Sequence, residues 1–147
     1  MINNMKSFKL FALLCILGVF FASCKEPKNE WENYFGYTNQ ELVGSYVSSN
    51  VTDAFDGLIE GTYCHICHDA TIKVTPNGGK LKFEIKSPNN SLTHNCAGDP
   101  SLGNNDCLIQ IGNELLATVY TNSSQGIRIH GYVRINDVNY YFDVIKE

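Results

Sequence analysis

The chain has 147 residues, with 11 Lys or Arg against 15 Asp or Glu, so its formal net charge at pH 7 is −4. The basic residues are scattered and form no cluster or stripe, which argues against a nucleic-acid-binding protein. The acidic balance also argues against electrostatic adhesion to anionic lipid headgroups.

Residues 1–23 have the organisation of a secretory signal. Lys6 and Lys9 precede an apolar run over residues 10–22 that contains no acidic residue, which matches the charged start and hydrophobic middle of such a signal. The run is about thirteen residues long, shorter than the ~20 that a helix needs to cross a bilayer. Small residues then lead to Cys24, and the chain turns polar. We therefore expect export and removal of this segment.

The segment Phe21-Ala22-Ser23-Cys24 resembles the lipobox of bacterial lipoproteins, with Phe21 where that family prefers leucine. The resemblance implies cleavage before Cys24 and attachment of diacylglycerol and a further acyl chain, such as palmitate, to Cys24. Each buried CH2 contributes ~0.8 kcal/mol, so several chains anchor a protein stably. Lys25-Glu26 is loosely similar to the surface-export signal of some Bacteroidetes-type lipoproteins. The expected location is the outer membrane, facing the periplasm or the cell surface; the alternative is an ordinary signal peptide cut nearby.

Residues 24–39 are polar and charged and show no sustained periodicity, so they are predicted to be a tether between the lipid anchor and the domain. Four aromatic residues interrupt this segment. Lone aromatics near a domain edge usually bury, so we expect these side chains to pack onto the domain: Trp31, Tyr34, Phe35 and Tyr37.

Residues 40–147 are predicted to form one all-β domain. Apolar and polar residues alternate, as at Leu81, Phe83 and Ile85, and this period of two is typical of strands with one buried face. Short turn sequences between the strands predict antiparallel neighbours. The pattern predicts eight strands, near 43–49, 57–63, 68–75, 80–87, 107–112, 115–121, 127–135 and 138–145. An up-and-down meander of this size is expected to close into a small barrel, with a β-sandwich as the alternative.

The opening Leu42-Val43-Gly44-Ser45-Tyr46 resembles the first strand of lipocalin-like, or calycin-like, bacterial lipoproteins. The strand and turn sequences 70–79 and 129–136 are also similar to that family. The resemblance implies a closed barrel that often holds a small apolar ligand, and no enzyme activity.

Four cysteines remain once Cys15 leaves with the signal and Cys24 is lipidated: Cys64, Cys67, Cys96 and Cys107. An even number in an oxidising compartment predicts two disulfides. A Cys96–Cys107 bridge would restrain the loop between them by ~3 kcal/mol. Pairing of Cys64 and Cys67 with Cys96 and Cys107 remains open.

The segment Cys64-His65-Ile66-Cys67-His68 has the C-x-x-C-H form of covalent haem attachment. Both thiols would bond to haem c, and His68 would ligate the iron in an electron-transfer lipoprotein. Zinc ligation by this segment with Cys96 or Cys107 and a redox pair are further alternatives.

No hydrolase elbow, metalloprotease helix or P-loop is present in the sequence, and Asp53, Asp56 and Glu60 lie in loop-like sequence. His94 and His130 have no visible partner. The sequence therefore predicts no catalytic residue, no metal site and no resident cofactor beyond the haem alternative. The expected function is a non-enzymatic binding or interaction module for a small apolar ligand or an envelope protein.

Overall fold

A computed structural model describes residues 30–100 and 106–147. The predicted signal, Cys24 and the first part of the tether lie outside these residues. The strands are β1 (Glu32–Asn33), β2 (Gly44–Ser48), β3 (Cys64–Ile66), β4 (Thr71–Asn77), β5 (Lys80–Ser87), β6 (Leu92–Gly98), β7 (Leu108–Ile111), β8 (Leu115–Asn122), β9 (Gly126–Ile135) and β10 (Val138–Lys146). The helical elements are α2 (Asn39–Leu42) and the 3-10 turn Pro88–Asn90. Neither described helix is long or apolar enough to cross a membrane.

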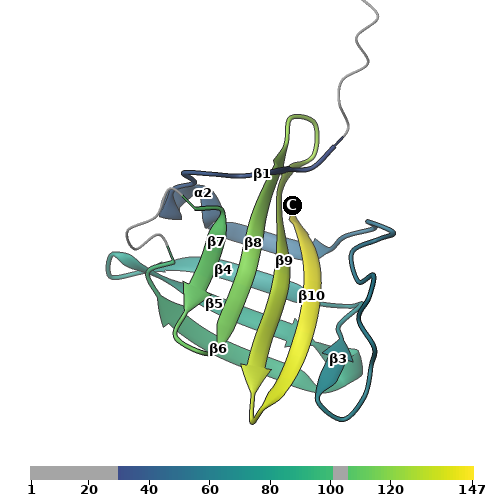
Figure 1. Ribbon diagram of the computed structural model, residues 1–147. Helices are drawn as coiled ribbons and strands as arrows, with labels where there is room; N and C mark the ends of the chain where they lie inside the picture. The colour runs from purple at the N-terminus through teal and green to yellow at the C-terminus, as the bar shows by residue number, and fades with distance from the viewer. Residues whose placement is uncertain (1–29, 101–105) are drawn as a thin grey trace, which may run out of the picture.

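All ten strands belong to one sheet, which is antiparallel except that β3 pairs with β10 in parallel. The strand order is β1-β8-β9-β10-β2-β4-β5-β6, and β7 pairs with the part of β8 that β1 leaves free. In Figure 1, β7 to β10 lie in front of β4 to β6, and the two groups of strands cross. The predicted all-β antiparallel fold is confirmed.

Apart from the short strands β1 and β3, strands that follow one another in the chain are also neighbours in the sheet. The exception is the step from β6 to β7. In the part of the chain that the structure describes, no ladder of main-chain hydrogen bonds joins these two strands. We call this boundary the seam. The predicted closed barrel is therefore not confirmed, because the sheet is open at the seam.

Two tight turns explain why the hairpins form where the sequence predicts them. Gly78 and Gly79 connect β4 to β5 with φ of 58° and 83°, and Asn136 and Asp137 connect β9 to β10 with φ of 51° and 65°. Two successive residues with positive φ make the turn whose twist matches antiparallel strands, and Gly, Asn and Asp adopt this conformation most readily.

The predicted strand at 57–63 is wrong. Residues 52–57 form turns, and the following segment contributes only an isolated bridge between Gly61 and Cys64. Ile59 and Tyr63 are 84% and 69% exposed, so the apolar residues that suggest a strand have no core to enter. Strand β6 is absent from the predicted set, because its sequence carries few apolar residues.

Residues 30–39, predicted as part of the tether, instead lie on the sheet. Strand β1 pairs with β8, and Tyr37 is buried while Tyr34 packs against the core. Thr38 caps α2 through a reciprocal arrangement with Glu41. Packing is thus confirmed for both tyrosines, whereas Phe35 is 61% exposed and that expectation is wrong.

Candidate functional site

The inside of the sheet is filled by side chains. Tyr46, Phe83 and Phe142 are the largest fully buried residues, and aliphatic residues surround them. The Tyr46 hydroxyl donates to the carbonyl of Leu42 at 2.8 Å, so its one polar atom is satisfied. Close packing of this kind leaves little room for a ligand within the core. A ligand site is therefore better sought on the outer face of the sheet.

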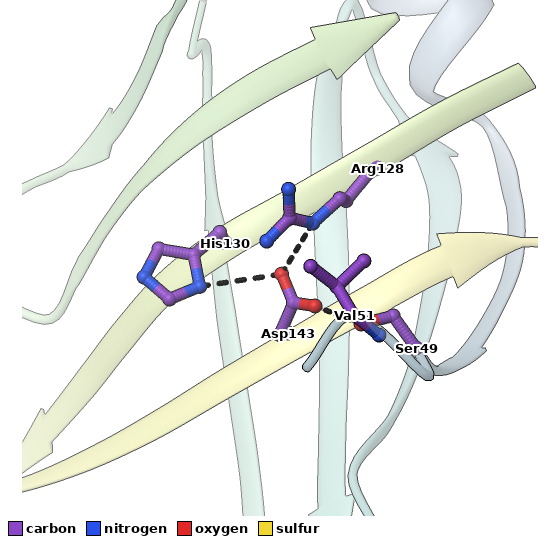
Figure 2. Close-up of polar contacts among 5 residues, drawn as sticks. All are labelled: Ser49, Val51, Arg128, His130 and Asp143. Carbon is purple, nitrogen blue, oxygen red and sulfur yellow. Dashed lines mark hydrogen bonds and ion pairs between the residues drawn. The ribbon is translucent and has the colours of Figure 1, made fainter. Parts of the chain in front are cut away.

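A polar cluster lies on the outer face of β9 and β10, centred on the buried carboxylate of Asp143 (Figure 2). Its Oδ1 accepts from Arg128 Nε at 2.7 Å and lies 3.2 Å from His130 Nδ1. Its Oδ2 accepts from the Ser49 hydroxyl. The side chains of Asp143 and Arg128 are 1% and 11% exposed, so this ion pair is largely removed from water.

Aromatic residues cover the same cluster. The Arg128 guanidinium lies 5.1 Å from the ring centroid of Tyr120 and 5.9 Å from that of Trp31. Phe55, from the loop before β3, lies 6.0 Å from the ring of His130 and 5.4 Å from that of His68. Cation–π and edge contacts of this kind stabilise the guanidinium and the rings. The cluster thus fastens the segment from Ser49 to Phe55 onto the sheet.

The arrangement does not resemble a nucleophile, a base and an orienting acid in series. Such a triad needs the hydroxyl on one imidazole nitrogen and the acid on the other. Here Ser49 and His130 both turn to the Asp143 carboxylate. The cluster is consistent with a structural role, and it supplies no activated hydroxyl.

Next to this cluster, a row of apolar and aromatic side chains crosses four strands on the outer face. Its members are register partners from strand to strand. Leu116 of β8 lies opposite Tyr132 of β9, and Tyr132 lies opposite Tyr141 of β10. Tyr141 lies opposite Ile66 of β3. The two tyrosine rings lie 5.2 Å apart. Leu116 is 36% exposed and the other three are half-buried. We call these four residues the outer row.

The outer row leads into a surface hollow of about 310 Å³. Leu116 and Tyr132 line one side of it, and Arg134 and Asp137 contribute charged groups. Gln110 and Asn113 add polar groups, so the hollow itself is mainly polar and the apolar surface is the wall beside it. Polar groups next to an apolar wall can orient a ligand that rests on that wall.

The C-x-x-C-H segment does not fit haem attachment. Covalent attachment would need both thiols beside one porphyrin. Cys67 is 1% exposed within the hydrophobic core, whereas His68 is exposed and meets the Phe55 ring edge to face. Burial also raises the pKa of the Cys67 thiol above its ordinary value. The haem alternative would require Cys67 to leave the core.

The four described cysteines are free thiols, with Cys64 half-buried and the other three buried. Strands β6 and β7 run side by side along the seam, where the Tyr37 hydroxyl contacts the carbonyls of both Pro100 and Leu108. Cys107 adjoins Leu108 at the end of the seam that Tyr37 closes, whereas Cys96 lies toward the other end, beside the contact between His94 and Glu114. No disulfide joins Cys96 to Cys107 in the described structure. The geometry does not favour the predicted Cys96–Cys107 bridge.

The predicted zinc set is also not assembled, because among the described residues no ligand atoms of the 64–68 segment converge with Cys96 or Cys107 into a metal-binding group. Asp53, Asp56 and Glu60 are exposed loop residues, as expected; Glu60 accepts from the Ile66 main-chain N–H at 3.0 Å.

Sequence reasoning misses the partners of both remaining histidines. His130 meets Asp143, and His94 Nε2 lies 3.2 Å from a carboxylate oxygen of Glu114. No local signal points to the first pair, because Asp143 stands between the core residues Phe142 and Val144 and alternation places it on the outer face, where an acid is ordinary.

Comparison of the chain with protein-family models, with curated proteins and with solved structures finds no match. The resemblance to lipocalin-like lipoproteins therefore stays a prediction.

Proposed function

We propose that this chain is a lipid-anchored, non-enzymatic binding module of the bacterial envelope, and that it takes its ligand on the outer row and the adjoining hollow. The observation that carries the proposal is the continuous band of Leu116, Tyr132, Tyr141 and Ile66 on the outside of the sheet. In an alternating strand this face would ordinarily be polar.

The chemistry of the band defines the ligand class. Tyrosine rings offer a large apolar contact area and lose little conformational entropy on binding. Arg134 lies in the same hollow and offers a planar donor for a carboxylate, sulfate or phosphate. The proposed ligand is thus a small apolar or ring-bearing molecule, or an envelope-protein side chain, that carries one anionic group.

The anchor is the second part of the proposal and rests on the sequence. The apolar run before Cys24 and the polar residues after it support lipidation at Cys24. A tethered protein meets envelope ligands at high local concentration, so modest affinity at an open site is sufficient.

Binding to the outer row is tested with anilinonaphthalene sulfonate, an apolar ring system with one anionic group. We expect saturable fluorescence enhancement that is weakened at least about tenfold by Tyr132→Ser with Tyr141→Ser, because the rings supply most of the apolar contact. The matched control is Tyr63→Ser, since Tyr63 is 69% exposed and lies outside the row. Equal binding by all variants, with unchanged near-ultraviolet circular dichroism, would exclude this site.

Anchoring is tested separately by metabolic labelling with an alkynyl palmitate analogue. The wild-type protein is expected to carry the label and to fractionate with membranes, and Cys24→Ala to lose the label. Equal labelling of Cys24→Ala, or an unlabelled wild-type protein, would remove the anchor from the proposal.

A further inference from the structure

A second cluster of chemically reactive side chains lies at the seam, away from the outer row. His94 and Cys96 are two residues apart on β6, so both side chains project from the same face of the strand. Their register partners on β5 are Ile85 and Phe83, which are core residues. Glu114 reaches the same place from the turn between β7 and β8.

The three side chains converge closely enough to share one ion. One ligand atom of each, an imidazole nitrogen, a sulfur and a carboxylate oxygen, lies within 4.8 Å of the other two. His94 and Glu114 are already in contact at 3.2 Å. Cys96 is only 6% exposed, whereas the Glu114 side chain is 54% exposed, so the cluster has a dry inner side and a wet outer side.

The cluster lies where a bound ion would join the two edges of the seam. At one end of the seam, Tyr37 links both edges by contacting the carbonyls of Pro100 and Leu108. In the middle the two edges are close, since a Cβ built on Gly98 would lie 3.0 Å from Ile111. At the other end, the approach of β6 to the β7–β8 turn rests on the contact between His94 and Glu114.

We propose that His94, Cys96 and Glu114 bind a divalent transition-metal ion of the zinc type, which joins β6 to the β7–β8 turn across the seam. Imidazole, thiolate and carboxylate are the three donor classes that zinc accepts in proteins. A sulfur donor argues against magnesium and calcium, which prefer oxygen. Three protein donors leave a fourth position for water on the exposed side, beside Glu114.

The electrostatics of the site change when a cation arrives. A thiol coordinates a metal ion in its deprotonated form, so a bound cation displaces the proton of Cys96 to solvent. Metal affinity is therefore expected to rise with pH.

The test uses full-length protein purified in detergent with a reductant, titrated with Co²⁺ as a spectroscopic probe and then with Zn²⁺. We expect one cobalt ion per chain, a thiolate-to-cobalt charge-transfer band, and displacement of cobalt by zinc. Loss of an outer-shell partner alone weakens metal binding about 10–100-fold. Glu114→Gln, which removes a direct donor, should weaken cobalt binding at least as much.

Cys96→Ser should abolish the charge-transfer band, and Cys107→Ser is the matched control because Cys107 is also a buried thiol but lies outside the cluster. Since Cys96→Ser changes a core residue, Glu114→Gln and His94→Gln keep the test independent of folding. A missing band in the wild-type protein would overturn the proposal. So would a band that survives in Cys96→Ser, or one that is lost in Cys107→Ser but retained in Glu114→Gln.

Discussion

The buried carboxylate of Asp143 offers the sharpest test of how this domain is held together. The substitution Asp143→Asn keeps the shape of the side chain and removes its charge. Arg128, whose side chain is 11% exposed, would then be left without its counter-charge. Removing one partner of a buried ion pair costs about 3–5 kcal/mol, because the remaining charge stays desolvated.

The lower end of this range is expected at Asp143. The amide oxygen of the introduced asparagine can still accept from Ser49, and Arg128 keeps its contacts with Tyr120 and Trp31. We therefore expect Asp143→Asn to lower the free energy of unfolding by about 3 kcal/mol. Arg128→Met, which preserves the apolar stem over Tyr120, should cost a similar amount, because the buried carboxylate loses its guanidinium partner.

The assay is urea unfolding followed by the fluorescence of Trp31, the single tryptophan of the chain. The double variant with both substitutions should cost clearly less than the sum of the two single variants, with a coupling of about 1–3 kcal/mol for groups in direct contact. A loss below about 1 kcal/mol for Asp143→Asn, or additive single variants, would refute the claim that this ion pair fastens the loop to the sheet.

Three further predictions concern other parts of the domain. Gly131→Ala should destabilise the fold by at least about 3 kcal/mol in the same urea assay, because the added Cβ would lie 2.2 Å from the main-chain oxygen of Leu116; near-wild-type stability would mean that β8 and β9 can separate. In the folded protein under reducing conditions, a thiol-alkylating reagent should modify Cys64 before the three buried cysteines, as peptide mass mapping would show, and labelling of a buried thiol first would contradict the packing described. The hydrogen bond from Tyr34 holds the pKa of Glu41 below its ordinary value, so Glu41 contributes stability that is present above its unfolded pKa and is lost as the pH falls through its lower folded value. Glu41→Gln should therefore flatten the acid limb of a stability profile measured by urea unfolding, and an unchanged limb would count against this contact.

The local features of this fold can be predicted from the sequence. The predicted bounds of β5 match the structure, and those of β2, β8, β9 and β10 nearly do, because alternation and turn residues act between neighbours in the chain. The pair Asn136 and Asp137 specifies its hairpin for the same reason. The export signal and lipidation at Cys24 are likewise predicted from a short local pattern. Both stay predictions, because they lie outside the described residues.

Long-range contacts are decided only by tertiary structure. Strand β6 carries few apolar residues, and its pairing with β5 is what makes it a strand. Residues 57–63 have apolar residues but no ladder partner in the described sheet, so they stay outside it. Periodicity assigns a face to each side chain and cannot say which distant group will lie opposite.

The two polar clusters show the same division. Ser49 reaches Asp143 from 94 positions away, and Glu114 meets His94 across a seam whose described edges share no ladder. A histidine on the polar face of a predicted strand looks solvated until a loop or a turn from elsewhere in the chain covers it. The sequence by itself determined most of the longer strands and the hairpin turns, and it predicts the anchor. The open seam, the buried ion pair and the cluster of His94, Cys96 and Glu114 depended on how the curved sheet brings its remote edges together, because no local pattern encodes that approach.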